Sequence, residues 1–300
     1  MPYLPSFRKT FRLDQKADLR EVAIAVESVY EANEIAVSYL GEIDPQENST
    51  GLRIHALLNL LGRVFEHAQA MLVALATGSP ASSEALARIV VEGSINIAYL
   101  ATKGNSATLV RFFRTWLTEH ERKLNDWKAE ISAAPYAARV TAMIEERRQL
   151  VAGLSAYVDQ VEEHCSLKEA KVVPEWPKSL FKRFEALGRQ TDYYESYHRL
   201  SGASHLTGED TITWLLAMEL PSDQKHQLAL EAWAYSTMMS RIASTFFIDA
   251  AASLVVAYGR TENADLLHCK KSLSKAVVEI AQKAGVPSSG SFASLMFVWA

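Results

Sequence analysis

Apolar side chains recur along most of this chain at the three- and four-residue intervals of an amphipathic α-helix. The interval is clear between residues 14 and 40, where Leu19, Val22, Val26 and Val29 fall on one helical face. Alternating runs of β-branched residues, and Asn-Gly or Asp-Gly turns between such runs, would indicate strands, and they are nearly absent. The pattern predicts an all-α fold, as a single multi-helix domain of about eight to ten helices.

Capping residues, glycines and prolines divide this pattern into segments. They predict helices at about 14–40, 50–77, 80–103, 106–127 and 135–164, a short one ending near 188, then 192–205, a short one opened by 207–210, and finally 222–258 and 262–285. Prolines at 174 and 177 disfavour helical backbone at the residues before them, so an extended linker is expected at 171–179.

The ends of the chain differ from the rest. Residues 1–13 are expected to form an N-terminal arm before a helical domain at 14–285. Residues 286–300 form an apolar tail, which ends in FASLMFVWA. An exposed aromatic terminus favours aggregation, so this tail is expected to dock on its own core, on a second subunit or on a partner.

The composition narrows the class of protein. A chain of 300 residues, 49% of them apolar, can bury a sizeable core. Its net charge of −4 argues against a dominant electrostatic attraction to nucleic acid or to an anionic membrane. Cys165 and Cys269 show neither a disulfide nor a zinc-site pattern, and the N-terminus lacks the apolar core of a secretory signal. We therefore expect a cytoplasmic protein with reduced thiols.

The most apolar stretch, residues 242–258, is expected to be a buried core helix. Asp249 interrupts it, and Arg241 and Arg260 flank it, so it is too short and too charged for a membrane span of roughly 20 residues. No membrane partner is expected. The sequence also has no glycine-rich phosphate loop or dinucleotide fingerprint, so no cofactor is expected.

A polar stripe runs through the helix predicted after Pro80. Arg88, Glu92 and Asn96 recur every four residues and therefore share one face. A solvated helix face would show the same pattern. The alternative is an inward-facing stripe, in which the Arg88 guanidinium holds a carboxylate or a ligand anion in bidentate geometry. On that interpretation, all three are candidate binding residues.

A second stripe lies in TDYYESYHRLSGASHLTG, where Tyr197, Ser201 and His205 recur at the same interval. Gly202 inside this helix costs about 1 kcal/mol relative to alanine, so close helix packing is expected to offset it. Ordinary core groups with satisfied hydrogen bonds would also explain this stripe. The functional alternative makes Tyr197 and Ser201 binding residues that complete the site of the first stripe.

The segment SSEALARIVVEGSINIAYL and the later Tyr197-x-x-x-Ser201-x-x-x-His205 spacing together resemble the bacterial helical family catalogued as domain of unknown function 5677. The resemblance covers roughly residues 50–260. It implies a helical fold and draws attention to the two stripes, but it implies no particular reaction.

The stretch from Arg199 to His205 is similar to the arginine–histidine signature of HEPN-type helical ribonucleases. Such a resemblance implies that Arg199 stabilises the charged transition state, and that His205 acts as general acid or base on the ribose 2′-hydroxyl without a metal. The polar residue that commonly follows the arginine is missing here. Chance alone gives between one and two such spacings, and a second runs from Arg114 to His120. A ribonuclease of the defence or toxin type, with RNA as substrate, is the alternative function.

Two other kinds of site have less support. Glu195-x-x-His198 has the spacing of a di-iron half-site, but the sequence has no second Glu-x-x-His, so no metal is expected. Ser201 and His205 as nucleophile and base lack a third orienting group.

Arg241 and Asp249 are charges within nearly unbroken apolar sequence. They lie about 12 Å apart along one helix and cannot pair with each other. We expect this helix to pack on the one that carries Arg88 and Glu92, and the four residues to form an internal charge network.

The sequence thus predicts a binding or interaction module with a polar site between two helices. An unknown small ligand or a protein is its expected partner, and a homodimer is a further option. RNA enters only with the ribonuclease alternative.

Overall fold

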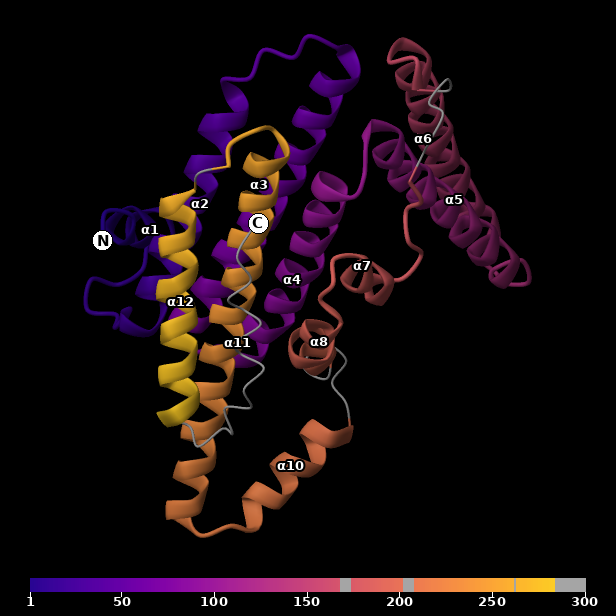
Figure 1. Ribbon diagram of the computed structural model, residues 1–300. Helices are drawn as coiled ribbons and strands as arrows, with labels where there is room; N and C mark the ends of the chain where they lie inside the picture. The colour runs from indigo at the N-terminus through magenta and orange to yellow at the C-terminus, as the bar shows by residue number, and fades with distance from the viewer. Residues whose placement is uncertain (168–173, 202–207, 262, 284–300) are drawn as a thin grey trace. The chain divides into compact units, whose positions relative to one another are not determined.

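The computed structural model describes residues 1–167, 174–201, 208–261 and 263–283. It is 82% helical and its described part has no strand, which confirms the all-α class (Figure 1). The described residues form eleven α-helices and one π-helical segment, η2. Their contacts fall into two compact units, one of residues 1–43, 57–102 and 178 onward, the other of residues 44–56 and 103–177.

The first unit contains most of the helices. They are α1 (Leu4–Thr10), α2 (Arg20–Gly41), the larger part of α3 (Asn48–Ala76), α4 (Pro80–Thr102), α7 (Leu180–Ala186), α8 (Gln190–Asp192), η2 (Tyr193–His198), α10 (Gly208–Glu219), α11 (Ser222–Ala257) and α12 (Ala264–Lys283). The second unit contains the start of α3, α5 (Ser106–Glu130) and α6 (Ala137–His164).

Most predicted boundaries agree with these helices to within a few residues, but the N-terminal part differs. The expected arm contains α1, whose Phe7 is fully buried. The helix expected from Asp14 begins only at Arg20. The Asp14 carboxylate accepts a hydrogen bond from the backbone N–H of Lys16 at 2.7 Å, which is a local turn rather than a helix cap.

Helix α11 is the central element of the first unit. It contacts α4, α12 and α2, and from Ala234 to Val255 nearly every residue is buried. A helix that is apolar on all sides belongs inside a core. This burial confirms the expected core helix at 242–258.

Hydroxyl groups inside this core form hydrogen bonds within the helix. Ser240, Ser244 and Ser253 of α11 each donate to the backbone carbonyl four residues earlier, at 2.7–2.9 Å. Ser83 of α4 meets the Ser240 hydroxyl at 2.8 Å. These hydrogen bonds offset the desolvation of the hydroxyls, and the small side chains allow α4 and α11 to pack closely.

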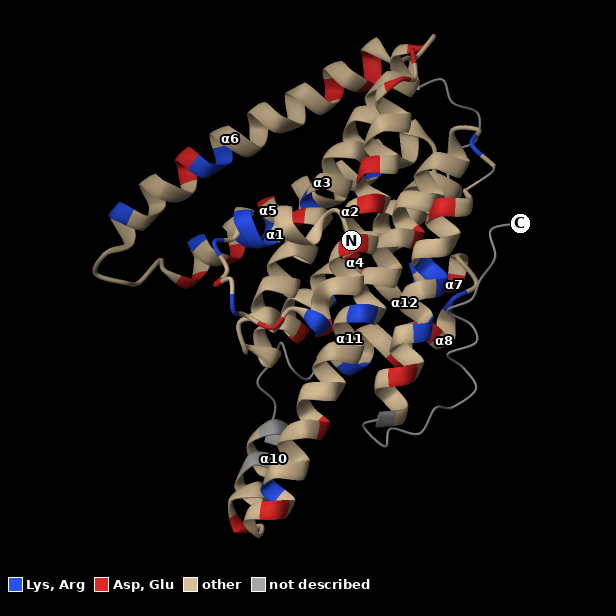
Figure 2. Ribbon diagram, turned by 90° about the vertical axis from the view of Figure 1, so that its left-hand side faces the viewer, with Lys and Arg blue, Asp and Glu red and all other residues tan. Residues whose placement is uncertain are grey.

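The hairpin of α5 and α6 has a core with a seven-residue repeat. Its buried residues are Val110, Leu117, Leu124, Ile131, Ile144, Val151 and Val158. A strict interval of seven is typical of coiled-coil packing between two helices. Charged residues of both signs lie toward the two ends of α6, and residues 149–158 between them carry no charge (Figure 2).

Asn105 caps the N-terminus of α5 with a complete capping box. Its side chain accepts from the Thr108 N–H at 2.9 Å, and the Thr108 hydroxyl accepts from the Asn105 N–H at 3.2 Å. The same hydroxyl donates to the Pro174 carbonyl at 3.1 Å. Pro174–Pro177, in the described part of the expected linker, is not helical and lies against α5.

Two described helices, α4 and α11, are long and apolar enough to cross a membrane by length and composition. Within the structure, 56% of that stretch of α4 and 89% of that of α11 are buried. Core helices have the same composition, so this finding assigns neither helix to a membrane.

Candidate functional site

The first polar stripe of α4 faces its neighbours α7 and η2. Helix α4 contacts both elements, and Arg88, Glu92 and Asn96 are all half-buried. The four-residue interval therefore identified a single helix face, and that face lies in an inter-helix contact rather than in open solvent.

Tyr197 of η2 joins two members of this stripe. The Arg88 guanidinium donates from Nη2 to the Tyr197 hydroxyl at 2.9 Å, and its carbon lies 4.8 Å from the centre of the ring. The hydroxyl in turn donates to Oε2 of Glu92 at 3.2 Å. Burial raises the pKa of Tyr197 above its ordinary value, so the phenol keeps the proton that it donates to Glu92.

Asn96 is reached by a residue that the sequence did not single out. Arg183 of α7 is 9% exposed, and its Nη1 donates to the amide oxygen of Asn96. Burial lowers the pKa of Arg183, and the nearby Glu92 carboxylate opposes that shift. The site is thus a cluster of Arg88, Glu92, Asn96, Arg183 and Tyr197, which we call the arginine–tyrosine cluster.

Tyr197 lies in the π-helical segment η2. Residues 193–198 form the wider turn of a π-helix, a feature often found at functional sites. Asp192 just before it is buried, and Ser196 donates to the Asp192 carbonyl. The wider turn allows Asp192 and Tyr197 to contact different partners on the two sides of the segment.

Aromatic rings fill the space around η2. Tyr193 packs against Phe181 and Phe184 of α7, with ring centres 5.2 and 5.6 Å apart. Tyr193 also lies 5.6 Å from Tyr197. Tyr194 remains 56% exposed beside them.

The other predicted residues of the second stripe lie apart from the cluster or outside the described residues. The Ser201 hydroxyl donates to the backbone carbonyl of Tyr197 at 3.1 Å. Arg199 is exposed. His205 lies outside the described residues, so its pairing with Arg199 stays a prediction. Both residues of the second Arg–His spacing, Arg114 and His120, lie within the described residues. Arg114 pairs there with Asp159 at 2.7 Å on the α5–α6 hairpin.

The expected charge network is wrong in its pairing, although α11 does pack on α4. Arg241 pairs with Glu21 at 2.8 Å and also donates to the Ala276 carbonyl at 2.9 Å. Neither Arg88 nor Glu92 is among these partners. Helical spacing indicated that Arg241 is buried. It did not indicate its partners, which lie on α2 and α12.

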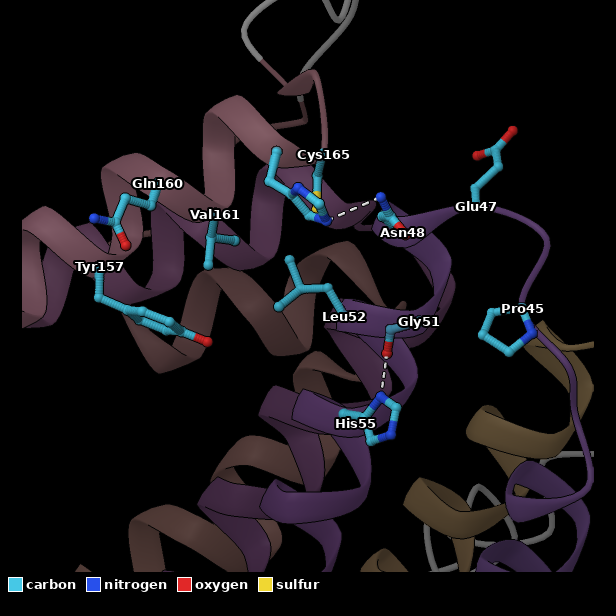
Figure 3. Close-up of a pocket in the computed structure, with 11 residues that line it drawn as sticks. Pro45, Glu47, Asn48, Gly51, Leu52, His55, Tyr157, Gln160, Val161 and Cys165 are labelled. Atoms are coloured by element: carbon cyan, nitrogen blue, oxygen red, sulfur yellow. Dashed lines mark hydrogen bonds between the residues drawn. The ribbon is translucent and has the colours of Figure 1, made fainter.

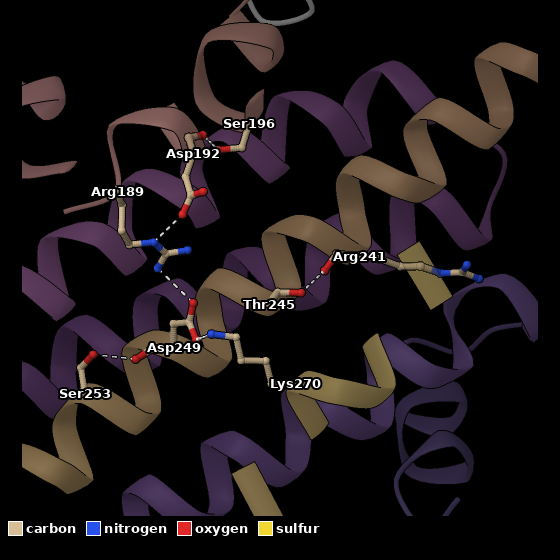
Figure 4. Close-up of polar contacts among 8 residues, drawn as sticks. All are labelled: Arg189, Asp192, Ser196, Arg241, Thr245, Asp249, Ser253 and Lys270. Atoms are coloured by element: carbon tan, nitrogen blue, oxygen red, sulfur yellow. Dashed lines mark hydrogen bonds and ion pairs between the residues drawn. The ribbon is translucent and has the colours of Figure 1, made fainter. Parts of the chain in front are cut away.

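Asp249 belongs to a separate buried tetrad (Figure 4). Arg189 lies 2.6 Å from Asp192 and 2.9 Å from Asp249, and Lys270 lies 2.7 Å from Asp249. The exposed fractions of the four side chains are between 3% and 12%. Burial by itself would lower the pKa of Arg189, but the two carboxylates outweigh it and raise that pKa. Two cations and two anions make the tetrad neutral.

A pocket of about 570 Å³ lies within the second unit, between the start of α3 and the end of α6 (Figure 3). The His164 Nε2 accepts from the Asn48 amide at 3.0 Å, and the His55 Nδ1 donates to the Gly51 carbonyl at 2.7 Å. Cys165 also lines it, and burial raises the pKa of that thiol. The sequence gave no signal for this pocket because its walls lie about one hundred residues apart.

In the described part of the chain, no group of three or more His, Cys, Asp or Glu side chains could hold a metal ion. Glu195 and His198, the expected half-site spacing, both lie on η2.

Comparison with known protein families identifies one match, and it covers the residues of this site. A model of a family of unknown function, DUF5677, matches residues 54–213. All five residues of the arginine–tyrosine cluster lie in that range. No curated protein and no solved structure matches the chain.

Proposed function

The chain belongs to the DUF5677 family, whose function is unknown, and from this premise we propose that it is a binding protein that holds a small anionic ligand at the arginine–tyrosine cluster. One observation carries the proposal: two guanidinium groups belong to the same cluster. Arg88 of α4 donates to the Tyr197 hydroxyl, and Arg183 of α7 donates to Asn96 within the electrostatic influence of Glu92 and Tyr197. Planar guanidinium groups suit carboxylates and phosphates because they can donate two parallel hydrogen bonds.

Burial of Arg183 supports an anionic ligand. Desolvation of its guanidinium is unfavourable and lowers its pKa, and the nearby Glu92 carboxylate opposes that shift. An anion bound beside the guanidinium would favour its charged form further. A buried arginine with a shifted pKa in an inter-helix contact is also typical of functional sites.

Tyr197 would adjust the site to its occupant. Its hydroxyl lies between Arg88 and Glu92, so it can donate to Glu92 in the free protein and to an anion in the complex. Glu92 accepts from the Tyr197 hydroxyl and acts electrostatically on Arg183, so its negative charge competes with an anionic ligand. Glu92→Gln should therefore strengthen anion binding, whereas loss of either arginine should weaken it.

The test measures thermal stability of the full chain in increasing inorganic phosphate, with sodium chloride at matched ionic strength as reference. A ligand at one hundred times its Kd stabilises the folded state by about 2.7 kcal/mol. We expect saturable stabilisation of the wild type, weaker stabilisation of Arg88→Gln and Arg183→Gln, and stronger stabilisation of Glu92→Gln.

The matched control is Arg63→Gln, because the Arg63 side chain is 71% exposed on α3. It should behave like the wild type. Equal stabilisation by phosphate and chloride, or an unchanged phosphate effect in Arg183→Gln, would reject the anion site.

A metal-independent ribonuclease remains a second candidate. The observation that favours it is the exposure of Arg199 at the end of η2, since an arginine that contacts an RNA phosphate must be accessible. The test is degradation of a mixed RNA pool in EDTA by the wild type and by His205→Ala, after both are shown to be folded. Cleavage that is lost in His205→Ala supports the ribonuclease, and absence of cleavage by the wild type rejects it.

The binding function is proposed for a cytoplasmic protein. Support comes from the two cysteines, which are both free thiols in the structure. Reduced thiols are the usual state in a cytoplasm.

A further inference from the structure

A run of large apolar side chains is exposed where α10 meets α11. On α10 these are Ile212, Leu215, Leu216 and Met218, and on α11 Leu230, with exposed fractions between 51% and 64%. We call these five residues the apolar hairpin face. Single exposed apolar residues are common, but a cluster on two adjacent helices marks a contact surface.

The first part of α11 is exposed, and the change to buried residues takes place within a few positions. Residues from Ser222 to Ala232 are exposed with one half-buried exception, and burial becomes continuous near Ala234. Helix α12 covers the buried part, whereas α10 and the start of α11 extend beyond the end of α12 (Figures 1 and 2).

The place where α12 ends follows from one contact. The Arg241 guanidinium donates to the Ala276 carbonyl at 2.9 Å, which fixes the alignment of these antiparallel helices. Helix α12 ends at Lys283, about 10 Å further along. The same distance back along α11 leads from Arg241 to about Ala234. The chain therefore leaves α12 beside the point where the exposed part of α11 begins.

The sequence that follows suits that surface. Residues 284–300 read AGVPSSGSFASLMFVWA, a short polar stretch and then an apolar segment without a Lys, Arg, Asp or Glu. Eight residues, 284–291, precede the apolar segment and can span up to about 26 Å. The exposed part of α11 is about 17 Å long, so the segment can reach the whole apolar hairpin face.

We propose that residues 284–300 dock on the apolar hairpin face and cover its exposed side chains. The apolar segment offers aromatic and aliphatic side chains, among them Phe292, Met296, Phe297 and Trp299. Their burial against the hairpin removes two apolar surfaces from water at once.

The chain's own tail fits this face better than a second copy does. The apolar hairpin face has five large apolar side chains, which a segment as short as residues 292–300 can cover. A tail tethered by a short linker also has an effective concentration of about 1 mM or more at a site within its reach. The docking is independent of the anion site.

The test compares hydrogen exchange of the full chain with that of Phe297→Ser/Trp299→Ser, both with all residues present. We expect amides of residues 211–233 to exchange at least about tenfold faster in the variant, with exchange on the α5–α6 hairpin unchanged. Ser291→Ala is the matched control in the polar stretch and should match the wild type.

A reciprocal variant separates docking from general instability. Leu216→Ser on the hairpin should accelerate exchange within residues 292–300, whereas Leu150→Ser, at a 49% exposed position of α6, should not. Unchanged exchange at 211–233 in Phe297→Ser/Trp299→Ser would overturn the proposal. Protection at 211–233 that rises with protein concentration, together with a dimer mass by light scattering, would overturn it in favour of a second copy.

Discussion

Arg189 and Asp249 are sixty residues apart in the sequence, yet Nη1 of the first lies 2.9 Å from Oδ2 of the second. This pair connects the segment before η2 to the central helix α11. Because Asp249 also contacts Lys270 of α12 at 2.7 Å, one carboxylate holds three parts of the fold together. The stability of the first unit should therefore depend strongly on it.

Asp249→Asn tests that dependence. The change leaves two buried cations with Asp192 as their only carboxylate in the tetrad, so we expect a loss of about 3–5 kcal/mol in the free energy of unfolding. Urea denaturation measures it. The control is Asp159→Asn, a 59% exposed residue that pairs with Arg114, which should cost less than about 1 kcal/mol. Equal effects of the two changes would contradict a stabilising role for the tetrad.

Tyr197→Phe removes the hydroxyl between Arg88 and Glu92. We expect it to cost about 1–3 kcal/mol, since two half-buried charged groups lose a hydrogen-bond partner. Tyr194→Phe, at the 56% exposed neighbour, should be close to neutral.

A double-mutant cycle of Tyr197→Phe with Glu92→Gln refines this measurement. The two costs should not add, because Tyr197→Phe removes the hydrogen bond to Glu92 and Glu92→Gln replaces its charged acceptor with a neutral amide oxygen. Additive costs would show that the Tyr197 hydroxyl and Glu92 contribute separately.

Gly93→Ala and Gly62→Ala form a matched pair on neighbouring helices. A Cβ at Gly93 of α4 would overlap Cγ2 of Val64 on α3, and Val64 is only 5% exposed. Overpacking there should cost about 1–3 kcal/mol. Nothing lies within 4 Å of a Cβ at Gly62, so Gly62→Ala should stabilise α3 by about 0.5–1 kcal/mol. Thermal unfolding of both variants checks the opposite signs.

Cys269 should resist thiol reagents. Burial raises its pKa to about 12, and the hydrogen bond to Glu31 adds to that shift, so the thiolate is scarce at pH 8. We expect a maleimide to label Cys165 long before Cys269 in the folded protein. Mass spectrometry of the labelled peptides decides this, and faster labelling of Cys269 would contradict its burial.

The same shift predicts how stability changes with pH. The folded pKa lies above the ordinary value of 9.0, so the folded state retains the proton between pH 9 and 12 while the unfolded chain releases it. The contribution of Cys269 is complete below pH 9 and falls by about 1.4 kcal/mol per pH unit between pH 9 and about 12. Cys269→Ala should lack this component, which the difference between the two unfolding curves isolates.

Helical spacing predicted the class, most boundaries and the face of α4 on which Arg88, Glu92 and Asn96 lie together. Arg183 was missed although its spacing carries a signal. Arg183 lies on the apolar face of Leu180 and Phe184, three residues after Leu180, whereas Lys182 points to another side and is exposed. The spacing of residues gives the direction in which a side chain points from its own helix. The residues that it contacts depend on which segments pack there, and Asp249 contacts one residue from each of two other segments.

The α5–α6 hairpin shows another limit. Trp116 and Trp127 stand out among its apolar residues, yet they are 45% and 44% exposed. The residues that pack are smaller and follow the seven-residue interval of Val110, Leu117 and Leu124. That interval is present in the sequence, and a count of sevens rather than of aromatic residues would have identified the core.

The second stripe was derived for an α-helix, and η2 is not one. A single residue turns an α-helix by about 100°, so a wider turn between Asp192 and Ser201 changes which side chains share a face. Tyr197 still meets the first stripe, while the Ser201 hydroxyl returns to the backbone.

The π-helical segment therefore constrains the number of residues between Asp192 and Tyr197 more than it constrains which residue types occupy them. Asp192 is fixed on one side of it and Tyr197 on the other, so the number of residues between them sets whether both contacts form. Exposed positions such as Tyr194 and His198 can accept many side chains. We expect that removal of one residue between Asp192 and Tyr197, with every remaining side chain unchanged, would rotate the tyrosine away from Arg88 and Glu92. The arginine–tyrosine cluster would then lose Tyr197 while the tetrad kept Asp192.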